Sequence, residues 1–343
     1  MNHNMKIITT ISPLAFSTFL RMLLLSGLLL CSYSVMAVVV SIDTFIDDMV
    51  MEHGFDQLDL TQLLEKAKVK KSILKLMSRP RKKKSKPTPW YRYRRIFVNT
   101  HRIREGMKYW RENANTLERA QSTYGVPAEI IVAIIGVETL YGKNKGKTRV
   151  IDALKTLAFN YPRRADFFRD ELKHYLLLTR DEGLNPLKQK GSYAGAMGIG
   201  QFMPSSFRRY AIDFDGDGKR NIWTNHVDAI GSVANYFLAH GWKTGEVVIQ
   251  ATQVRPNAVP SLLALPFKPE YTLRQLKRRG VLYHGDEPNS TDSMFIDLET
   301  EIGTAYWVGF QNYYVITRYN RSKRYAMAVY QLAQEIANRY GEN

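Results

Sequence analysis

The stretch that decides the fold is VPAEIIVAIIGVET, residues 126–139. Proline falls in its first turn, where the missing N–H removes no hydrogen bond, and isoleucine and valine occupy several of its faces. An amphipathic surface helix would show one apolar stripe instead. The pattern therefore predicts a helix that is buried in the core of the protein and ends at Gly142.

Glu138 lies near the C-terminal end of this apolar helix. A carboxylate is costly to bury in its charged form, and both desolvation and the negative end of a helix raise its pKa. A carboxylic acid that stays protonated near neutral pH is what a glycosidase uses to protonate a leaving oxygen. The alternative is a glutamate that turns to solvent at the helix end, and position alone leaves both interpretations open.

A segment rich in small residues follows at 191–206, GSYAGAMGIGQFMPSS. Glycine lets the backbone approach a ligand closely, and the side chains of Ser192 and Gln201 can hydrogen-bond sugar hydroxyls or amides. The segment lacks the lysine and the spacing of a phosphate-binding loop. Residues 142–148, GKNKGKT, have three residues between the glycines, where the nucleotide loop has four. We expect a nucleotide site in neither segment.

An acidic loop at 213–219, DFDGDGK, matches the first half of a calcium-binding loop. Position 12 of the loop is Thr224 rather than the usual glutamate, so the closing ligand must come from elsewhere. The predicted ligands are Asp213, Asp215, Asp217, Lys219 through its backbone carbonyl, and Asp228. The alternative is a plain acidic turn. The pattern favours a structural Ca²⁺ that holds the loop after the glycine-rich segment.

The N-terminal residues 1–37 have the layout of a secretion signal. Positive charge at Lys6 and Arg21 precedes the apolar run 22–30, and a small residue stands where cleavage would occur. Residues 22–40 are also long enough to cross a bilayer. The segment is therefore either a signal peptide or a signal anchor, and we expect an exported, periplasmic protein with or without membrane association.

Cys31 is the only cysteine, which excludes a disulfide framework and a cysteine-cluster metal site. Leu30 precedes it where a lipoprotein has a small residue, so lipid attachment is not predicted. The formal net charge is +17, and residues 66–95 hold 14 basic residues and no acidic one. In an exported protein this run predicts a solvated linker, or attraction to an anionic envelope surface that salt would screen. A nucleic-acid partner is not expected.

Helix-like spacing of apolar residues covers much of the chain. Helices are predicted over 44–77 (with a turn at His53-Gly54), 104–124, 227–240 and 324–339. Prolines and four consecutive basic residues make 79–89 a loop, and 246–304 reads as short strands and turns. The fold class is therefore mainly α, with a smaller β part (α+β).

Five stretches together resemble the membrane-bound lytic murein transglycosylase B family. They are IIVAIIGVETLYG, KTRVIDALKTLAFNYPRRADFF, GSYAGAMGIGQFMPSSFRRYAIDFDGDG, DAIGSVANYFLAHGW and YNRSKRYAMAVYQLA. The resemblance covers residues 41–343. It implies cleavage, without water and without an organic cofactor, of the β-1,4 bond between N-acetylmuramic acid and N-acetylglucosamine in peptidoglycan glycan strands. Glu138 would be the sole catalytic carboxylate, acting first as acid and then as base on the muramyl 6-hydroxyl, which closes a 1,6-anhydro ring.

The fold implied by the resemblance is a lysozyme-like core with an N-terminal helical domain and a small strand-rich domain. After residues 1–37, its parts are an N-terminal helical region at 38–125 with the basic loop 79–89, the catalytic core with the calcium loop at 126–244, the strand-rich domain at 245–304, and a C-terminal segment at 305–343 that completes the core.

Further site residues carry over from the resemblance. The implied substrate contacts are Ser192, Gln201, Tyr236, Asn320, Tyr325, Arg163 and Arg164, with Tyr93 as a weaker candidate. Tyr236 and Tyr325 have a plain alternative as core aromatics. The calcium ligands also match, although the loop is one residue longer between Lys219 and Asp228 than in the family. The absence of a lipidation signature departs from the lipid-anchored members.

No second catalytic carboxylate is predicted. Glu171, Asp181 and Glu182 are interpreted as surface helix charges, and His240 as a cation at a helix end. Two alternatives remain. One is a hydrolytic muramidase, which needs a positioned water and normally a second carboxylate; the other is a non-catalytic peptidoglycan-binding scaffold. A monomer is the expected state.

Overall fold

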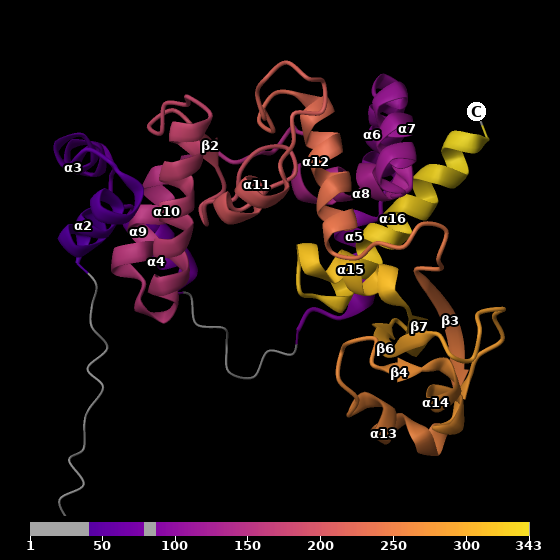
Figure 1. Cartoon of the computed structure of the whole chain (residues 1–343). Coiled ribbons are helices and arrows are strands. Elements are labelled where there is room, and N and C mark those ends of the chain that lie inside the picture. The colour runs from indigo at the N-terminus through magenta and orange to yellow at the C-terminus, as the bar shows by residue number, and fades with distance from the viewer. Residues whose placement is uncertain (1–40, 79–86, 343) are drawn as a thin grey trace, which may run out of the picture. The chain divides into compact units, whose positions relative to one another are not determined.

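The computed structural model describes residues 41–78 and 87–342. Within it, helix α8 (Ala128–Thr139) is buried at every position except Glu129 and Glu138. Four helices pack on it: α6 (Thr100–Glu112), α7 (Ala114–Tyr124), α12 (His226–Ala239) and α16 (Lys323–Gly341) (Figure 1). The apolar faces of α8 are therefore covered on several sides, as its sequence predicts.

The N-terminal residues form three short helices where the sequence predicts one helical stretch with a turn. They are α2 (Ile42–His53), α3 (Gln57–Lys66) and α4 (Lys71–Met77). Gly54 takes a left-handed φ of 63° at the predicted turn, a conformation that side chains disfavour. Asp56 caps α3 by accepting a hydrogen bond from the Asp59 backbone. Helix α4 packs on α9 (Val150–Asn160), which packs on α10 (Ala165–Asp181).

Two predicted segments fall wholly or largely outside the described residues. These are the signal at 1–37 and positions 79–86 of the basic loop. Helix α5 (Trp90–Phe97) starts directly after Pro89, and the helix predicted over 104–124 is two helices, α6 and α7, that break at Asn113. Of the helices in the described ranges, none alone is long and apolar enough to span a membrane. Only α7 and α8 taken together reach that length and composition, and they are bent by 114° where they meet.

A five-stranded antiparallel sheet forms the strand-rich part, in the order β4-β6-β7-β3-β5; strands β3, β4, β6 and β7 are labelled in Figure 1. Its strands are β3 (Ile249–Val254), β4 (Tyr271–Thr272), β5 (Val281–Leu282), β6 (Asp292–Thr300) and β7 (Gly303–Gly309). A separate apolar cluster, with Leu262, Leu276 and Val308 among its members, joins the sheet to α13 (Val259–Leu263) and α14 (Leu273–Arg278). Strand β7 runs through residue 304, so the sheet extends past the boundary placed there from sequence.

After the sheet, the chain returns to α8. Helix α15 (Gln311–Tyr319) follows β7, and α16 packs against α8. Buried Asn312 ties α15 to the loop after α12, because its side chain bonds the backbone N–H and the carbonyl of Lys243. The remaining short elements are β1 (Thr148–Arg149), β2 (Lys190–Gly191), α11 (Pro204–Tyr210) and two turns of 3₁₀ helix at Pro162–Arg164 and Pro256–Ala258.

Candidate active site

The C-terminal end of α8 positions Glu138. The helix stops at Thr139, three residues before the predicted end at Gly142. It stops there because Leu140 and Tyr141 take left-handed backbone conformations, with φ of 51° and 60°. Residues with a Cβ rarely adopt this region, and such strain gathers at functional sites. The structure therefore marks this helix end as unusual independently of its carboxylate.

Glu138 keeps partial exposure between buried Val137 and Thr139. The Tyr325 hydroxyl donates a hydrogen bond to Glu138 Oε1 at 2.6 Å. Desolvation raises the pKa of Glu138 from 4.5 to about 7, and the hydrogen bond from Tyr325 opposes this by favouring the charged form. Because desolvation is the larger cause, the Glu138 carboxyl group is protonated in a substantial fraction of molecules at neutral pH. The direction of the shift is the one that the sequence predicts.

Tyr325 lies in the first turn of α16 and is itself buried. Ser322 caps this helix by accepting from the Tyr325 backbone N–H at 3.3 Å, and the Tyr313 hydroxyl donates to the Lys323 carbonyl at 2.6 Å. Burial and the nearby Glu138 carboxylate raise the pKa of Tyr325 well above 10. Its hydroxyl therefore stays protonated and remains a hydrogen-bond donor at physiological pH.

The glycine-rich segment 191–206 is docked on the end of α8. The Thr139 hydroxyl donates to the Ile199 carbonyl at 2.8 Å and accepts from the Gly142 backbone N–H at 2.9 Å. Gly198 has a φ of 70°, and a Cβ there would lie 2.5 Å from the Ile222 carbonyl oxygen. Only glycine fits this position without displacing the backbone. The loop is thereby held against the residue that follows Glu138.

Ser192 and Gln201, the two polar residues predicted from this segment, both stabilise the loop. The Ser192 hydroxyl accepts from the backbone N–H groups of Ala194 and Ala196, at 3.3 and 3.0 Å. The Gln201 amide donates to the Gly198 carbonyl at 2.9 Å, from a backbone with a left-handed φ of 54°. Both side chains are partly exposed, so each keeps polar atoms available to a ligand.

A layer of tyrosines lies behind the glycine-rich segment. The Tyr319 hydroxyl donates to the Gly200 carbonyl at 2.6 Å, and the Tyr236 ring centre lies 4.8 Å from that of Tyr319. The Tyr236 hydroxyl donates to the Arg318 carbonyl at 2.8 Å. Tyr236 is only 7% exposed, so a ligand can touch no more than a small part of its ring.

Three further predicted contacts are exposed. Asn320 follows the last residue of α15, and Arg163 and Arg164 lie in the 3₁₀ turn before α10. The Arg164 guanidinium packs over the Phe167 ring, 4.1 Å from its centre. Within the described ranges, Glu138 has no hydrogen bond or ion pair with either arginine. Only a substrate long enough to reach from Glu138 to Arg163 and Arg164 would contact all three residues.

Tyr93, the weaker candidate, lies on α5 near Glu138. Its pKa is raised by desolvation first, with a contribution from the Glu138 carboxylate. The Arg324 guanidinium packs over its ring at 5.4 Å. The structure thus brings Tyr93 and Tyr325 to the same carboxyl group from two different helices.

Sequence reasoning missed two residues of this site, Thr139 and Tyr319. Thr139 joins α8 to the glycine-rich segment, and Tyr319 holds the Gly200 carbonyl. The sequence indicates these two residues only by their position next to predicted site residues, since Thr139 follows Glu138 and Tyr319 precedes Asn320.

The interpretation of Glu171 and Glu182 as surface charges is wrong. Glu171 is 3% exposed, and its carboxylate accepts from the backbone N–H and the hydroxyl of Ser205, at 2.9 and 2.7 Å. Glu182 accepts from the Arg220 backbone and side chain. Backbone N–H groups at a helix start need acceptors, and Glu171 serves α11 in this way. Asp181, with its side chain 39% exposed, does lie at the surface.

His240 is not the cation expected at the end of α12. Burial lowers its pKa, and its ring stacks on Tyr236 with the ring centres 4.0 Å apart. The side chain therefore packs as a neutral ring at neutral pH.

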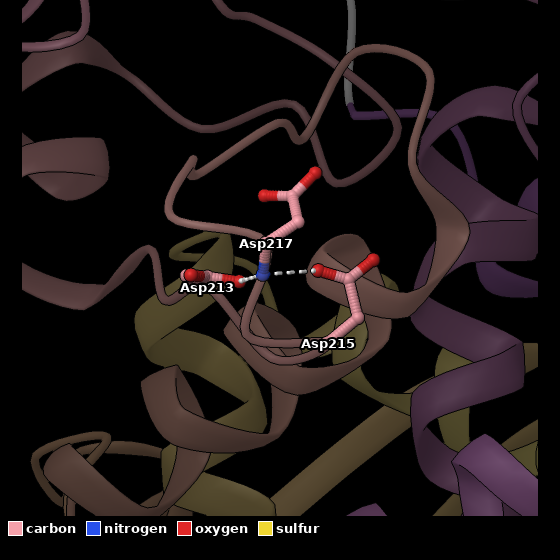
Figure 2. A group of neighbouring side chains, drawn as sticks. All are labelled: Asp213, Asp215 and Asp217. Carbon is pink, nitrogen blue, oxygen red and sulfur yellow. Dashed lines mark hydrogen bonds between the residues drawn. The ribbon is translucent and has the colours of Figure 1, made fainter.

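Asp213, Asp215 and Asp217 converge in the acidic loop (Figure 2). One oxygen of each carboxylate lies within 4.8 Å of the other two. Ca²⁺ binds oxygen at about 2.3–2.6 Å, so oxygens at this spacing can share one ion. The Asp217 backbone N–H donates to Asp213 and Asp215, at 3.1 and 3.3 Å (Figure 2). Gly216 and Gly218 have φ of 79° and 85°, which permits the tight turn. The donor set therefore fits calcium.

Asp228 is fully buried in the first turn of α12. Its two carboxylate oxygens accept from the backbone N–H groups of Phe214 and Asn221, at 2.8 and 2.7 Å. It therefore braces both ends of the acidic loop and is not among the three converging carboxylates. In this respect the structure differs from the predicted ligand set. Lys219 is exposed, and its backbone N–H donates to Asp217 at 2.9 Å.

The arrangement around Glu138 suits acid–base chemistry at a single carboxyl group. Across the described ranges, the two causes that set its pKa are desolvation and Tyr325, and neither is a second carboxylate. A conventional glycosidase has two carboxyl groups about 5–10 Å apart on either side of the bond. One acid with a pKa near neutrality can instead donate a proton and later take one back.

Comparison with known proteins assigns the chain to a family. The family described as Transglycosylase SLT domain matches residues 40–334. This chain belongs to that family. The SLT-family chain is 47% identical over 299 residues to the membrane-bound lytic murein transglycosylase B of Escherichia coli (strain K12). The aligned region covers 85% of this chain and 81% of that protein.

Solved structures of the SLT family are similar as well. Soluble lytic transglycosylase SltB1 from Pseudomonas aeruginosa matches with a TM-score of 0.83 and 48% identity, over 87% of this chain and 99% of that chain. The Escherichia coli lytic transglycosylase Slt35 in complex with calcium matches with a TM-score of 0.77 and 47% identity, over 86% and 92%. The predicted family and the mainly helical, lysozyme-like fold class are thereby confirmed.

Proposed function

We propose that this protein is a lytic transglycosylase that cleaves the β-1,4 bond between N-acetylmuramic acid and N-acetylglucosamine in peptidoglycan. Glu138 acts as acid and then as base, and the product ends in 1,6-anhydromuramic acid. The observation that carries the proposal is the Glu138 carboxyl group, which has a pKa of about 7, a hydrogen bond from Tyr325 and no second carboxylate among the described groups that set its pKa.

The two steps balance without water. In the first, protonated Glu138 gives its proton to the glycosidic oxygen, the bond from muramyl C1 to that oxygen breaks, and N-acetylglucosamine leaves with a free 4-hydroxyl. In the second, the Glu138 carboxylate takes the proton of the muramyl 6-hydroxyl while O6 bonds to C1. The carboxyl group ends protonated and ready for another cycle. Tyr325 orients it and favours the carboxylate between the two steps.

The remaining site residues are proposed as substrate contacts. Ser192 and Gln201 would bind sugar hydroxyls and amides, because both lie on the segment docked at the end of α8. The other proposed contacts are Tyr236, Asn320, Tyr325, Arg163 and Arg164, with the two arginines facing lactyl or peptide carboxylates. Exposed arginine is well suited to that partner, since its planar group bonds carboxylate in a bidentate manner.

The test is digestion of purified peptidoglycan in H₂¹⁸O, followed by mass spectrometry of the products, with Glu138→Gln in parallel. The expected products carry unlabelled 1,6-anhydromuramic acid ends and are lost with the variant. Reducing ends that carry the label would show hydrolysis and make the protein a muramidase. Binding of peptidoglycan without any cleavage by the wild type would make it a scaffold.

The acidic loop is proposed to bind a structural Ca²⁺ through Asp213, Asp215, Asp217 and the Lys219 carbonyl. The convergence of three carboxylate oxygens within 4.8 Å supports this, and the related Slt35 structure contains calcium. Asp228, predicted as a further ligand, accepts one backbone N–H at each carboxylate oxygen, so it would join the ion through a remaining lone pair. An ion here would hold the chain between α11 and α12 in one conformation.

The protein is proposed to be exported to the periplasm and to associate with the membrane. Residues 1–37 have the charge and apolar pattern of a signal peptide or a signal anchor, and the curated relative is named as membrane-bound. Cell fractionation with an antibody against the C-terminal helix distinguishes the two forms. A cleaved signal gives a shortened chain that salt releases from membranes, whereas an anchor gives a full-length chain that only detergent releases.

A further inference from the structure

A basic pocket of about 440 Å³ lies apart from Glu138, where the chain after α3 meets β1 and α9. Four cationic side chains line it: Lys68, Lys70, Lys147 and Arg149. Ser72 and Thr148 also line the pocket, so its lining includes two hydroxyl residues beside the four cations. Among the residues that the structure describes, Asp152 is the only acidic one in the lining. A wall of this kind selects an anion with several oxygens.

Asp152 does not neutralise the pocket. Its carboxylate is buried and accepts from the Arg149 guanidinium at 2.7 and 2.9 Å and from the Lys68 backbone N–H at 2.8 Å. Lys70 lies 3.8 Å from it. Lys68 and Lys147 are exposed, and neither forms an ion pair within residues 41–78 and 87–342. The pocket therefore retains a net positive charge after its internal pairing.

The walls of the pocket are held in place by α9. The Lys70 backbone N–H donates to the Thr156 hydroxyl at 2.9 Å, and Lys155 donates to the Leu64 and Ala67 carbonyls, at 2.7 and 3.1 Å. The cationic side chains thus project from a backbone that is fixed before any ligand arrives. Such preorganisation reduces the entropy lost on binding.

The pocket adjoins the proposed glycan contacts through a short β-ladder. Thr148 and Arg149 of β1 pair with Gly191 and Lys190 of β2, and Ser192 follows directly. The residues just before β1 also contact the glycine-rich segment, because the Gln201 amide donates to the Lys145 carbonyl at 3.3 Å. A chain of four or five residues extends about 3.3–3.6 Å per residue, or about 15 Å in all. A peptide of this length that starts at Ser192 can therefore extend across the β1–β2 pair.

We infer that this pocket binds the carboxylates of the peptide stem that peptidoglycan carries on its muramyl residues. The inference rests on the proposed function, since it takes the muramyl residue to lie against Ser192 and Gln201. The ligand class is an acidic peptide attached to the glycan, held by Lys68 and Lys147 with Arg149 behind them. The pocket would then favour strands that still carry stems over strands from which the stems have been removed.

The test compares two substrates and two matched variants. Peptidoglycan with intact stems and glycan strands stripped of stems by an amidase are digested by the wild type, by Lys68→Gln/Lys147→Gln, and by the control Lys75→Gln/Lys108→Gln. The control removes the same charge from exposed lysines that do not line the pocket. Release of anhydromuramyl product gives kcat and KM at low and at high salt.

The expected result is a KM for stem-bearing strands that rises about three- to tenfold in the pocket variant, with kcat unchanged. The difference in KM between the pocket variant and the wild type should disappear on stripped strands and at high salt. The control variant should have the KM of the wild type on both substrates. A KM unchanged on stem-bearing strands, an equal rise on stripped strands, or an equal rise in the control would overturn the inference.

A binding measurement separates this inference from the proposed function. If the wild type releases no anhydromuramyl product from either substrate, the proposed function fails, and titration of isolated stem peptide then decides on the pocket alone. Peptide binding that is weakened in the pocket variant supports the site, and equal binding by both proteins overturns it. Competition by inorganic phosphate at the same concentration as peptide would show a general anion site and would also overturn the peptide assignment.

Discussion

Glu138 and Asp215 carry the same functional group in opposite surroundings. Glu138 ends an apolar helix, and desolvation raises its pKa to about 7. Asp215 is exposed in the acidic loop, and the hydrogen bond from the Asn225 side chain is the first of the causes that lower its pKa. One carboxyl group therefore holds a proton near neutral pH, and the other remains charged.

The contrast shows how one residue type can serve two kinds of chemistry. A carboxyl group that exchanges its proton near pH 7 can act as both acid and base. Charged carboxylates that converge without neutralising partners attract a cation instead. The distinction comes from the packing of α8 against α16 and from the turns at Gly216 and Gly218.

Glu138→Gln has the largest expected effect. General acid–base catalysis contributes about 10²–10⁴-fold, and here one group supplies both steps, so release of anhydromuramyl product should fall by about 10³-fold or more. The amide cannot donate or accept the proton but keeps nearly the same shape. Product release is followed by chromatography, with circular dichroism as the control for folding. A variant that retains a tenth of the activity would contradict the assigned role.

The same substitution should change how stability depends on pH. The folded-state pKa of Glu138 lies above its ordinary value, so the stability that this group contributes is fully present below about pH 4.5 and is lost as pH rises through about 7. Glu138→Gln lacks this dependence. Relative to the wild type, the variant should gain about 1–3 kcal/mol in free energy of unfolding between pH 5 and pH 8. Urea unfolding at both pH values measures it, and parallel curves would refute the raised pKa.

Tyr325→Phe removes the hydrogen bond that lowers the pKa of Glu138. The pKa should rise further, so the alkaline limb of the kcat/KM profile should move upward by about one pH unit. The turnover number should fall by about tenfold, because the carboxyl group loses its orienting partner. A pH profile of product release measures both quantities. An unchanged alkaline limb would mean that Tyr325 serves only in packing.

Calcium removal tests the other carboxylate site. If the Kd is about 10⁻⁴ M, 2 mM Ca²⁺ stabilises the folded state by about 1–2 kcal/mol, and chelation should lower Tm by about 3–6 °C. Asp215→Asn should reduce the response of Tm to calcium. Differential scanning calorimetry with and without chelator gives the values. A Tm that is indifferent to calcium would leave the loop as an acidic turn.

Tyr319→Phe has the smallest expected effect and serves as the matched control for Tyr325→Phe. It removes a buried hydroxyl that bonds the Gly200 carbonyl and not Glu138. The cost should be about 1 kcal/mol in free energy of unfolding, with the alkaline limb of the pH profile unmoved. A shift of that limb equal to the one in Tyr325→Phe would show that any loss of a buried hydroxyl alters Glu138.

Local patterns predicted the features that depend on local chemistry. The apolar run 126–139 indicated a buried helix, and its one late carboxylate indicated a raised pKa. The spacing of aspartates in 213–219 indicated the convergence that the structure contains. In each case the residues that matter are neighbours in the chain, so their geometry follows from helix or turn conformation.

Features made by distant segments could not be predicted in this way. Tyr325 lies 187 residues from Glu138 in the chain, and the resemblance alone suggested it. The sequence around Glu171 predicts a surface charge on α10, because its hydrogen-bond partner Ser205 lies on another helix, α11. Asp228 is predicted as the closing calcium ligand, and in the structure its oxygens accept from two backbone N–H groups. Each outcome depends on tertiary packing that no local pattern encodes.

The difference between Glu138 and Asp215 is tested most directly by a ¹³C NMR titration of the glutamate and aspartate side-chain carboxyl groups. Glu138 is assigned from the signal that is missing in Glu138→Gln, and Asp215 from the signal that is missing in Asp215→Asn. The expected result is a Glu138 pKa of about 7 and an Asp215 pKa below its ordinary value. A Glu138 pKa near 4.5, with both groups titrating together, would contradict it.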